Sequence, residues 1–99
     1  NNTLSPSHLK WKTVDKLIMH LSPSPNPCYR FLETSHLGSV VTRTPCKSMD
    51  EMGLQLSDVI IRLNGEDVSS LEAESVSEMI NSMVGESVHI TYLRRNMEM

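Results

Sequence analysis

The 99-residue sequence has few of the residues that build a large core: it has four aromatic side chains, and 38% of its residues are apolar. A chain of this length forms one domain with a modest core, in which its seven methionines fill gaps. Long apolar runs are also lacking. We therefore expect a soluble piece with neither a transmembrane helix nor a signal peptide.

An excess of basic charge is missing as well. Nine Lys and Arg residues stand against twelve Asp and Glu residues, and the formal net charge is −3. No stretch concentrates the basic residues enough to follow a phosphate backbone, so we expect no nucleic-acid partner and no membrane insertion. The chain begins without methionine and ends at Met99 within a predicted strand, from which we expect an excised domain. Its compartment stays open.

Residue patterns that support metal binding or catalysis are likewise lacking. Two cysteines, Cys28 and Cys46, are too few for a disulfide framework; they are free thiols by default, with a single bridge as the alternative. The four histidines have no ligand spacing, and no serine lies in a G-x-S-x-G context. We expect no metal, no cofactor and no catalytic residue in this chain.

What the sequence does contain is a central segment, Gly53–Val68, in which signals for a helix end, a strand and a tight turn follow one another. A glycine suited to ending a helix is followed by Asp58, whose carboxylate can accept backbone N–H bonds, and by the buried strand 59–63. Asn64-Gly65 tolerates positive φ at both positions, so a tight turn follows the strand. Glu66 to Val68 is then a short further strand.

Upstream, the chain is predicted to start with a helix. Ser5-Pro6 suits a helix start, and the apolar residues from Leu9 to Leu21 are spaced for one stripe of a helix over residues 7–20. The Pro-rich run 22–27 ends that helix and forms a stiff connector. Two strands, Cys28–Thr34 and Ser39–Arg43, follow with a turn at His36 to Gly38.

Two more helices and a final strand are predicted. Ser48 caps a short helix through Met52, and Ser69 or Ser70 caps a longer one, Leu71–Met83, which Gly85 terminates. A strand then begins at Val88 by alternation, and a hairpin turn is expected at 94–96. The apolar face of the longer helix is marked by Leu71, Val76, Met79, Ile80 and Met83.

The central segment resembles the PDZ domain, whose pattern is A-G-L-x-x-G-D-x-I-x-x-x-N-G-x-x-V. Met52 and Ser57 stand where the family usually has alanine and glycine, and the resemblance runs from about Gly38 to Arg94. It implies an α+β, mainly β fold: a small, partly open sandwich or barrel of five to six strands with two helices, here with the extra N-terminal helix. Residues 1–24 would be that helix and connector, and 25–99 the PDZ-like domain. The matching residues are Gly53, Leu54, Asp58, Ile60, Asn64, Gly65 and Val68.

Two features of the sequence are similar to features found in the PDZ domains of Deg/HtrA serine proteases. They are the junction made by Thr13–Ile18, the connector and Tyr29-x-x-Leu32, and the turn at 94–96 leading into 97–99. This likeness implies a substrate-recognition domain whose parent is a serine endopeptidase, with its triad before Asn1 and its protease domain as a further partner. The short loop between Leu32 and Gly38 argues against it, and a scaffold protein is the alternative.

In PDZ domains a peptide C-terminus adds as a strand between the first long strand and the second helix. Phe31 stands where the carboxylate-binding loop is expected to have glycine, which restricts the backbone there, although Arg30 can supply a compensating charge. The resemblance places peptide binding at Tyr29, Arg30, Phe31, Leu32, Glu33, Thr34, Glu72, Val76 and Met79.

Three alternatives remain at this site. Glu72, at the family's selectivity position, either favours a basic or amide ligand side chain or only stabilises the helix N-terminus as a first-turn acid. Met79 either lines the groove or fills the core. Finally, Phe31 and the N-terminal helix could block the groove, leaving a domain that holds an oligomer or a neighbouring domain.

Overall fold

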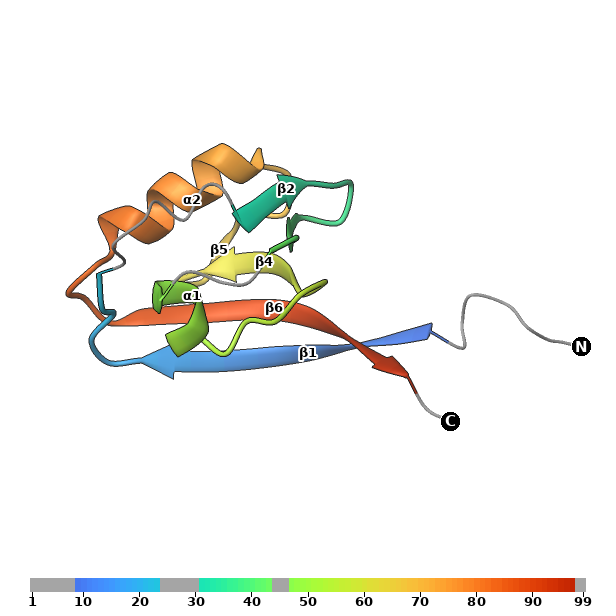
Figure 1. Cartoon of the computed structure of the whole chain (residues 1–99), viewed down its shortest axis with the longest axis horizontal. Helices are drawn as coiled ribbons and strands as arrows, with labels where there is room; N and C mark the ends of the chain where they lie inside the picture. The colour runs from blue at the N-terminus through green and yellow to red at the C-terminus, as the bar shows by residue number, and fades with distance from the viewer. Residues whose placement is uncertain (1–8, 24–30, 44–46, 98–99) are drawn as a thin grey trace, which may run out of the picture.

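The predicted central strand is β4 (Val59–Leu63), which lies in the middle of a six-stranded antiparallel sheet in the computed structural model (Figure 1). The structure describes residues 9–23, 31–43 and 47–97. The strand order is β1-β6-β4-β3-β2, and β5 pairs with β4. The predicted fold class is confirmed: a small, mostly β fold with an open sheet and two helices. The remaining elements are β1 (Leu9–Ile18), β2 (Leu32–Thr34), β3 (Ser39–Val41), α1 (Lys47–Glu51), β5 (Glu66–Asp67), α2 (Ala73–Ser82) and β6 (Val88–Met97).

The turn after β4 is confirmed in detail. Asn64 and Gly65 have φ of 52° and 80°, the left-handed conformation that this dipeptide tolerates. The Asn64 side chain also accepts a 2.7 Å hydrogen bond from the backbone N–H of His89 in β6. Within β4 the register against β6 shifts between Ile60 and Arg62, and this irregularity allows both Ile60 and Leu63 to be fully buried although they are three residues apart.

The predicted N-terminal helix is wrong, because residues 9–18 form β1. This strand pairs with β6 over its whole length, from Leu9 opposite Met97 to Ile18 opposite Val88. Val14 and Ile18 pack against the core while Leu17 is exposed, so only some of the apolar residues that suggested a helix are buried. The β-branched and aromatic residues of the segment favour a strand once a partner strand is available.

The predicted hairpin turn at 94–96 is also wrong, because these residues belong to β6. β6 continues without a break to Met97, because β1 supplies it with partners as far as Leu9. The far end of the β1–β6 pair extends away from the rest of the sheet (Figure 1), and the molecule measures 50 × 24 × 23 Å.

The other boundaries are shifted by a few residues. β2 begins at Leu32 and β3 ends at Val41; Cys28 to Arg30, both cysteines and the connector residues 24–27 lie outside the described residues. The helix α1 begins at Lys47, so Ser48 is not its cap. Gly53 ends α1 as predicted, with φ of 78°.

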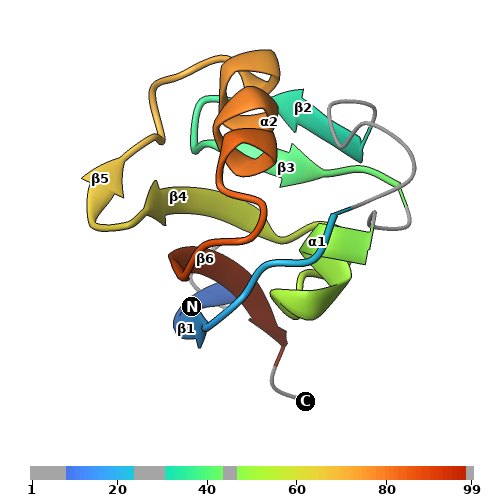
Figure 2. The same cartoon turned by 90° about the vertical axis from the view of Figure 1, so that its left-hand side faces the viewer.

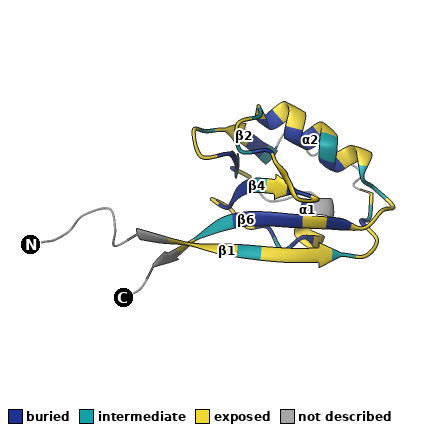
Figure 3. Cartoon of the chain, turned by 180° about the vertical axis from the view of Figure 1, so that it is seen from behind, coloured by how far each residue is buried: buried dark blue, intermediate teal, exposed yellow. Residues whose placement is uncertain are grey.

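One core joins the sheet to both helices, and the buried residues lie between them (Figure 3). After β1 the chain turns back at Leu21, which is fully buried and exchanges backbone hydrogen bonds with Gly85 and Glu86. The backbone N–H of Ser22 donates to the Glu51 carboxylate at 2.8 Å. Hydrogen bonds from the Ser22 side chain and from its backbone lower the pKa of Glu51. In the described part of the chain, no helix is long and apolar enough to cross a membrane. The largest fully buried side chains include Tyr92, Leu21, Met49, Met52, Ile60, Leu63, Ile80 and Ile90.

Candidate functional site

The candidate site lies where the edge strand β2 runs beside α2 (Figure 2). β2 is the last strand in the sheet order and pairs only with β3 among the described strands. Its other edge therefore keeps backbone donors and acceptors available for one more strand. Leu32 on β2 and Val76 on α2 are buried, and Met79 is partly buried against the same core.

A side chain from β2 holds the start of α2. The backbone N–H of Ala73, the first residue of α2, donates a 2.8 Å hydrogen bond to Oγ1 of Thr34. Glu72 occupies the cap position with φ of −70° and ψ of 151°, but its side chain makes no capping bond. The predicted caps Ser69 and Ser70 are wrong: Ser69 bonds to Asp67 instead, and the helix begins at Ala73, two residues after the predicted start at Leu71. Thr34 thus links the two walls of the site.

Replacing Thr34 by valine should destabilise the domain by about 1 kcal/mol, since valine keeps the shape but leaves the Ala73 N–H without its acceptor. Thr34→Ser keeps the acceptor and should restore most of the stability. Thr42→Val, at an exposed threonine outside the site, is the control. Urea unfolding followed by circular dichroism measures the effect, and equal stability of Thr34→Val and wild type would contradict it.

The structure separates the other predicted site residues by environment. Phe31 is partly buried and packs against the core, while its carbonyl accepts a hydrogen bond from Thr42. Glu33 and Glu72 are exposed. Tyr29 and Arg30 lie outside the described residues. Their roles in binding stay predictions.

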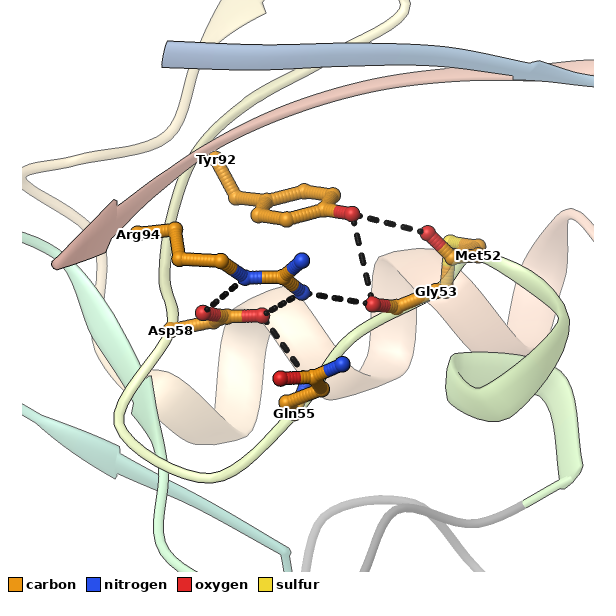
Figure 4. Close-up of polar contacts among 6 residues, drawn as sticks. All are labelled: Met52, Gly53, Gln55, Asp58, Tyr92 and Arg94. Atoms are coloured by element: carbon orange, nitrogen blue, oxygen red, sulfur yellow. Dashed lines mark hydrogen bonds and ion pairs between the residues drawn. The ribbon is translucent and has the colours of Figure 1, made fainter. Parts of the chain in front are cut away.

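A polar cluster missed by the sequence analysis anchors β6 to the loop after α1 (Figure 4). The Arg94 guanidinium donates from Nε and Nη2 to the two carboxylate oxygens of Asp58, at 3.0 and 2.6 Å, and from Nη2 to the Gly53 carbonyl at 2.8 Å. Asp58 also accepts from the Gln55 backbone N–H at 2.8 Å, as its position in the sequence predicts. Hydrogen bonding to Asp58 raises the pKa of Arg94.

Tyr92 lies beside this cluster and is fully buried. Its hydroxyl donates to the carbonyls of Met52 and Gly53 at 3.3 Å, and the Arg94 guanidinium lies 5.3 Å from its ring centre. Burial raises the pKa of Tyr92. The cluster therefore ties β6 to the segment between α1 and β4. Among the described residues no group of three or more His, Cys, Asp and Glu side chains could hold a metal ion.

The family model for the PDZ domain matches residues 32–93, nearly two thirds of the chain. The chain belongs to the PDZ family. Ser57 illustrates the fit: it stands where the family usually has glycine and adopts φ of 76°. The left-handed conformation of that turn is thus kept without the glycine, at some conformational cost.

Two solved structures show the same PDZ fold. "Structure of INAD PDZ45 in complex with NG2 peptide" aligns with a TM-score of 0.66 and 15% identity over 91% of this chain and 45% of that one. The fifth PDZ domain of InaD aligns with a TM-score of 0.57 and 19% identity over 89% of this chain and 100% of that one. This chain therefore spans about half of the first structure. No curated protein sequence matches it.

The likeness to Deg/HtrA proteases is not supported. Both structures above are InaD PDZ domains, and the two features that suggested a protease domain fold otherwise. Thr13–Ile18 is part of a strand instead of a junction helix, and 94–96 is a strand instead of a turn. The strand β1 does not cover the candidate PDZ site, because β1 and β2 are opposite ends of the sheet.

Proposed function

We propose that this PDZ domain is a peptide-recognition module of a scaffold-type protein, and that it binds an extended peptide, including a C-terminus, along β2. The observation that carries the proposal is the position of β2, an edge strand with its open side facing α2. A bound peptide becomes the next strand of the sheet, so main-chain hydrogen bonds supply affinity. The InaD PDZ45 structure, which has a similar fold, contains a peptide.

The walls of this groove select an apolar side chain. Leu32, Val76 and Met79 are apolar and lie at the β2–α2 contact, where alternate side chains of an added strand point. Met79 can adapt its flexible side chain to ligands of different shape. A peptide ending in an apolar residue is therefore the proposed ligand.

The carboxylate end of the ligand would be held by the loop before β2. The proposed loop residues are Tyr29, Arg30, Phe31 and Leu32, with backbone N–H groups and the Arg30 charge facing the carboxylate. Packing of the Phe31 side chain against the core supports this arrangement, because it takes the large side chain out of the peptide's path.

Charge at the rim adds a preference for basic ligands. Glu72 is exposed at the start of α2 and has no capping bond, so its carboxylate is available to a ligand side chain. Glu33 is exposed on the opposite face of β2 from Leu32 and Thr34. A Lys or Arg upstream of the apolar terminus would meet Glu72 if its side chain points toward α2, and Glu33 if it points to the other face of β2. Each exposed pair contributes a few tenths of a kcal/mol up to about 1 kcal/mol.

The test is an NMR titration of the domain with pooled peptides that end in apolar residues, beside the same peptides amidated at the C-terminus. We expect shifts at residues 31–34 and 72–79 that disappear on amidation. Shifts that persist would indicate internal segments as ligands, and no shifts with either pool would reject the groove.

A matched pair of variants tests the charge preference. Glu72→Gln should weaken binding of a peptide with an upstream Arg roughly twofold to fivefold. Glu74→Gln, on the outer side of α2, should leave affinity unchanged. Equal effects of the two variants would show that Glu72 does not touch the ligand.

A further inference from the structure

The sheet has a second open edge, at β1, and it is longer than the one at β2. β1 runs for ten residues and pairs only with β6 among the described strands. About half of its N–H and C=O groups point away from β6, as alternation in an antiparallel ladder requires. In Figure 1 no helix or strand lies on the outer side of β1. This edge is distant from α2 and plays no part in the proposed groove.

The side chains of β1 carry different chemistry on its two faces. Lys12 and Lys16 point to the face that β6 uses for Val88, Ile90 and Tyr92, and both are exposed. Within the described part of the chain neither lysine has a carboxylate at ion-pair distance. On the other face, Trp11 is 37% and Leu17 63% exposed.

The single acid of β1 is already engaged. Asp15 accepts a 2.5 Å hydrogen bond from the Thr91 hydroxyl and lies 3.1 Å from His89 Nε2. It therefore points along β6, not toward the two lysines, which lie on the opposite face of the strand. The free charge along this edge is positive although the whole chain carries −3.

Pairing with a second copy of the chain is disfavoured in the registers centred on the middle of β1. Two β1 strands paired antiparallel about Val14 would place Lys12 of one copy opposite Lys16 of the other. Antiparallel pairing centred on Asp15 would place the two copies of Asp15 opposite each other, and pairing centred on Lys16 would do the same for Lys16. Like charges directly opposite in a sheet are destabilising, and lysines on an edge strand prevent such self-association.

We propose that the β1 edge is a second peptide-binding edge, which adds an extended acidic segment whose acidic and apolar residues alternate. Its acids lie opposite Lys12 and Lys16, its apolar residues cover Trp11 and Leu17 on the other face, and its backbone pairs with β1. With the groove at β2, the sheet then holds a different peptide at each end. The proposal does not depend on the groove.

The probe is a synthetic peptide in which Glu alternates with Val, acetylated and amidated so that no terminal carboxylate is present. Titration into the 99-residue chain should shift the NMR signals of residues 11–18 and the fluorescence of Trp11, the only tryptophan. Signals of residues 31–34 and 72–79 should not move. Raising the salt concentration should weaken binding.

Matched variants test whether the positive charge of the β1 edge is what binds the acidic peptide. Lys12→Glu should weaken binding roughly threefold to tenfold, whereas Lys47→Glu, an exposed lysine of α1, changes the net charge equally and should not. Glu72→Gln, in the groove, should also leave it unchanged.

Several results would overturn the proposal. They are equal binding of a Lys-Val peptide, shifts confined to β2 and α2, equal affinity of Lys12→Glu and wild type, or no binding at all. Concentration-dependent shifts of β1 without peptide would show that the edge binds another copy instead. Because the probe has no free C-terminus, failure here leaves the groove titration unaffected.

Discussion

Replacing Arg94 by alanine is expected to destabilise the domain by roughly 2–4 kcal/mol, a large part of the stability of a small domain. The substitution removes three hydrogen bonds and leaves the Asp58 carboxylate, whose side chain is 3% exposed, without its cation. A buried charge without a partner costs more than the pair contributed, because it keeps its desolvation penalty. The partial exposure of Arg94, 26%, places the expected loss below that of a fully buried pair.

The matched control is the next residue. Arg95 is exposed and lies 5.6 Å from the Trp11 ring, so Arg95→Ala should cost at most about 0.5 kcal/mol. Arg94→Lys keeps the charge but not the two-pronged contact and should fall between the two. Urea unfolding monitored by circular dichroism measures all three. Equal losses for Arg94→Ala and Arg95→Ala would mean that the Asp58 contact does not stabilise the fold.

Substitution of Gly38 by alanine is expected to cost roughly 2–4 kcal/mol, because the added Cβ would lie 2.5 Å from the Ile60 carbonyl oxygen and 2.9 Å from Val59 Cγ1. Gly38 also has φ of 150°, where L-residues are strained. It belongs to the turn between β2 and β3, held by hydrogen bonds between Ser35 and Gly38. The strain should therefore reach β2 and lower peptide affinity as well as stability.

A second glycine provides the control for this prediction. Gly65 has φ of 80° but nothing within 4 Å of an added Cβ, so Gly65→Ala should cost only about 1 kcal/mol of conformational energy. Thermal unfolding and the peptide titration, applied to both variants, separate steric clash from backbone preference. If Gly65→Ala proved as damaging as Gly38→Ala, the contact with Ile60 would not be the cause.

At the candidate site, the local sequence pattern predicts the buried face of α2 but not its cap. The helical spacing of Val76, Met79 and Ile80 is enough to predict which face of α2 meets the core, because periodicity is a property of the segment itself. The cap of α2 is not predictable in this way. Thr34 reaches Ala73 from 39 positions away, and no local residue marks that contact.

Local residue preferences account for the segment around β4 but not for β1. The glycine stop, Asp58, the buried strand and the Asn64-Gly65 turn were determined locally, since each depends on backbone preferences of the residues concerned. The spacing of the apolar residues from Leu9 to Ile18 is compatible with a helix as well as with a strand. Pairing with β6, more than 60 residues downstream, decided for the strand, because an edge strand gains its hydrogen bonds only from its neighbour.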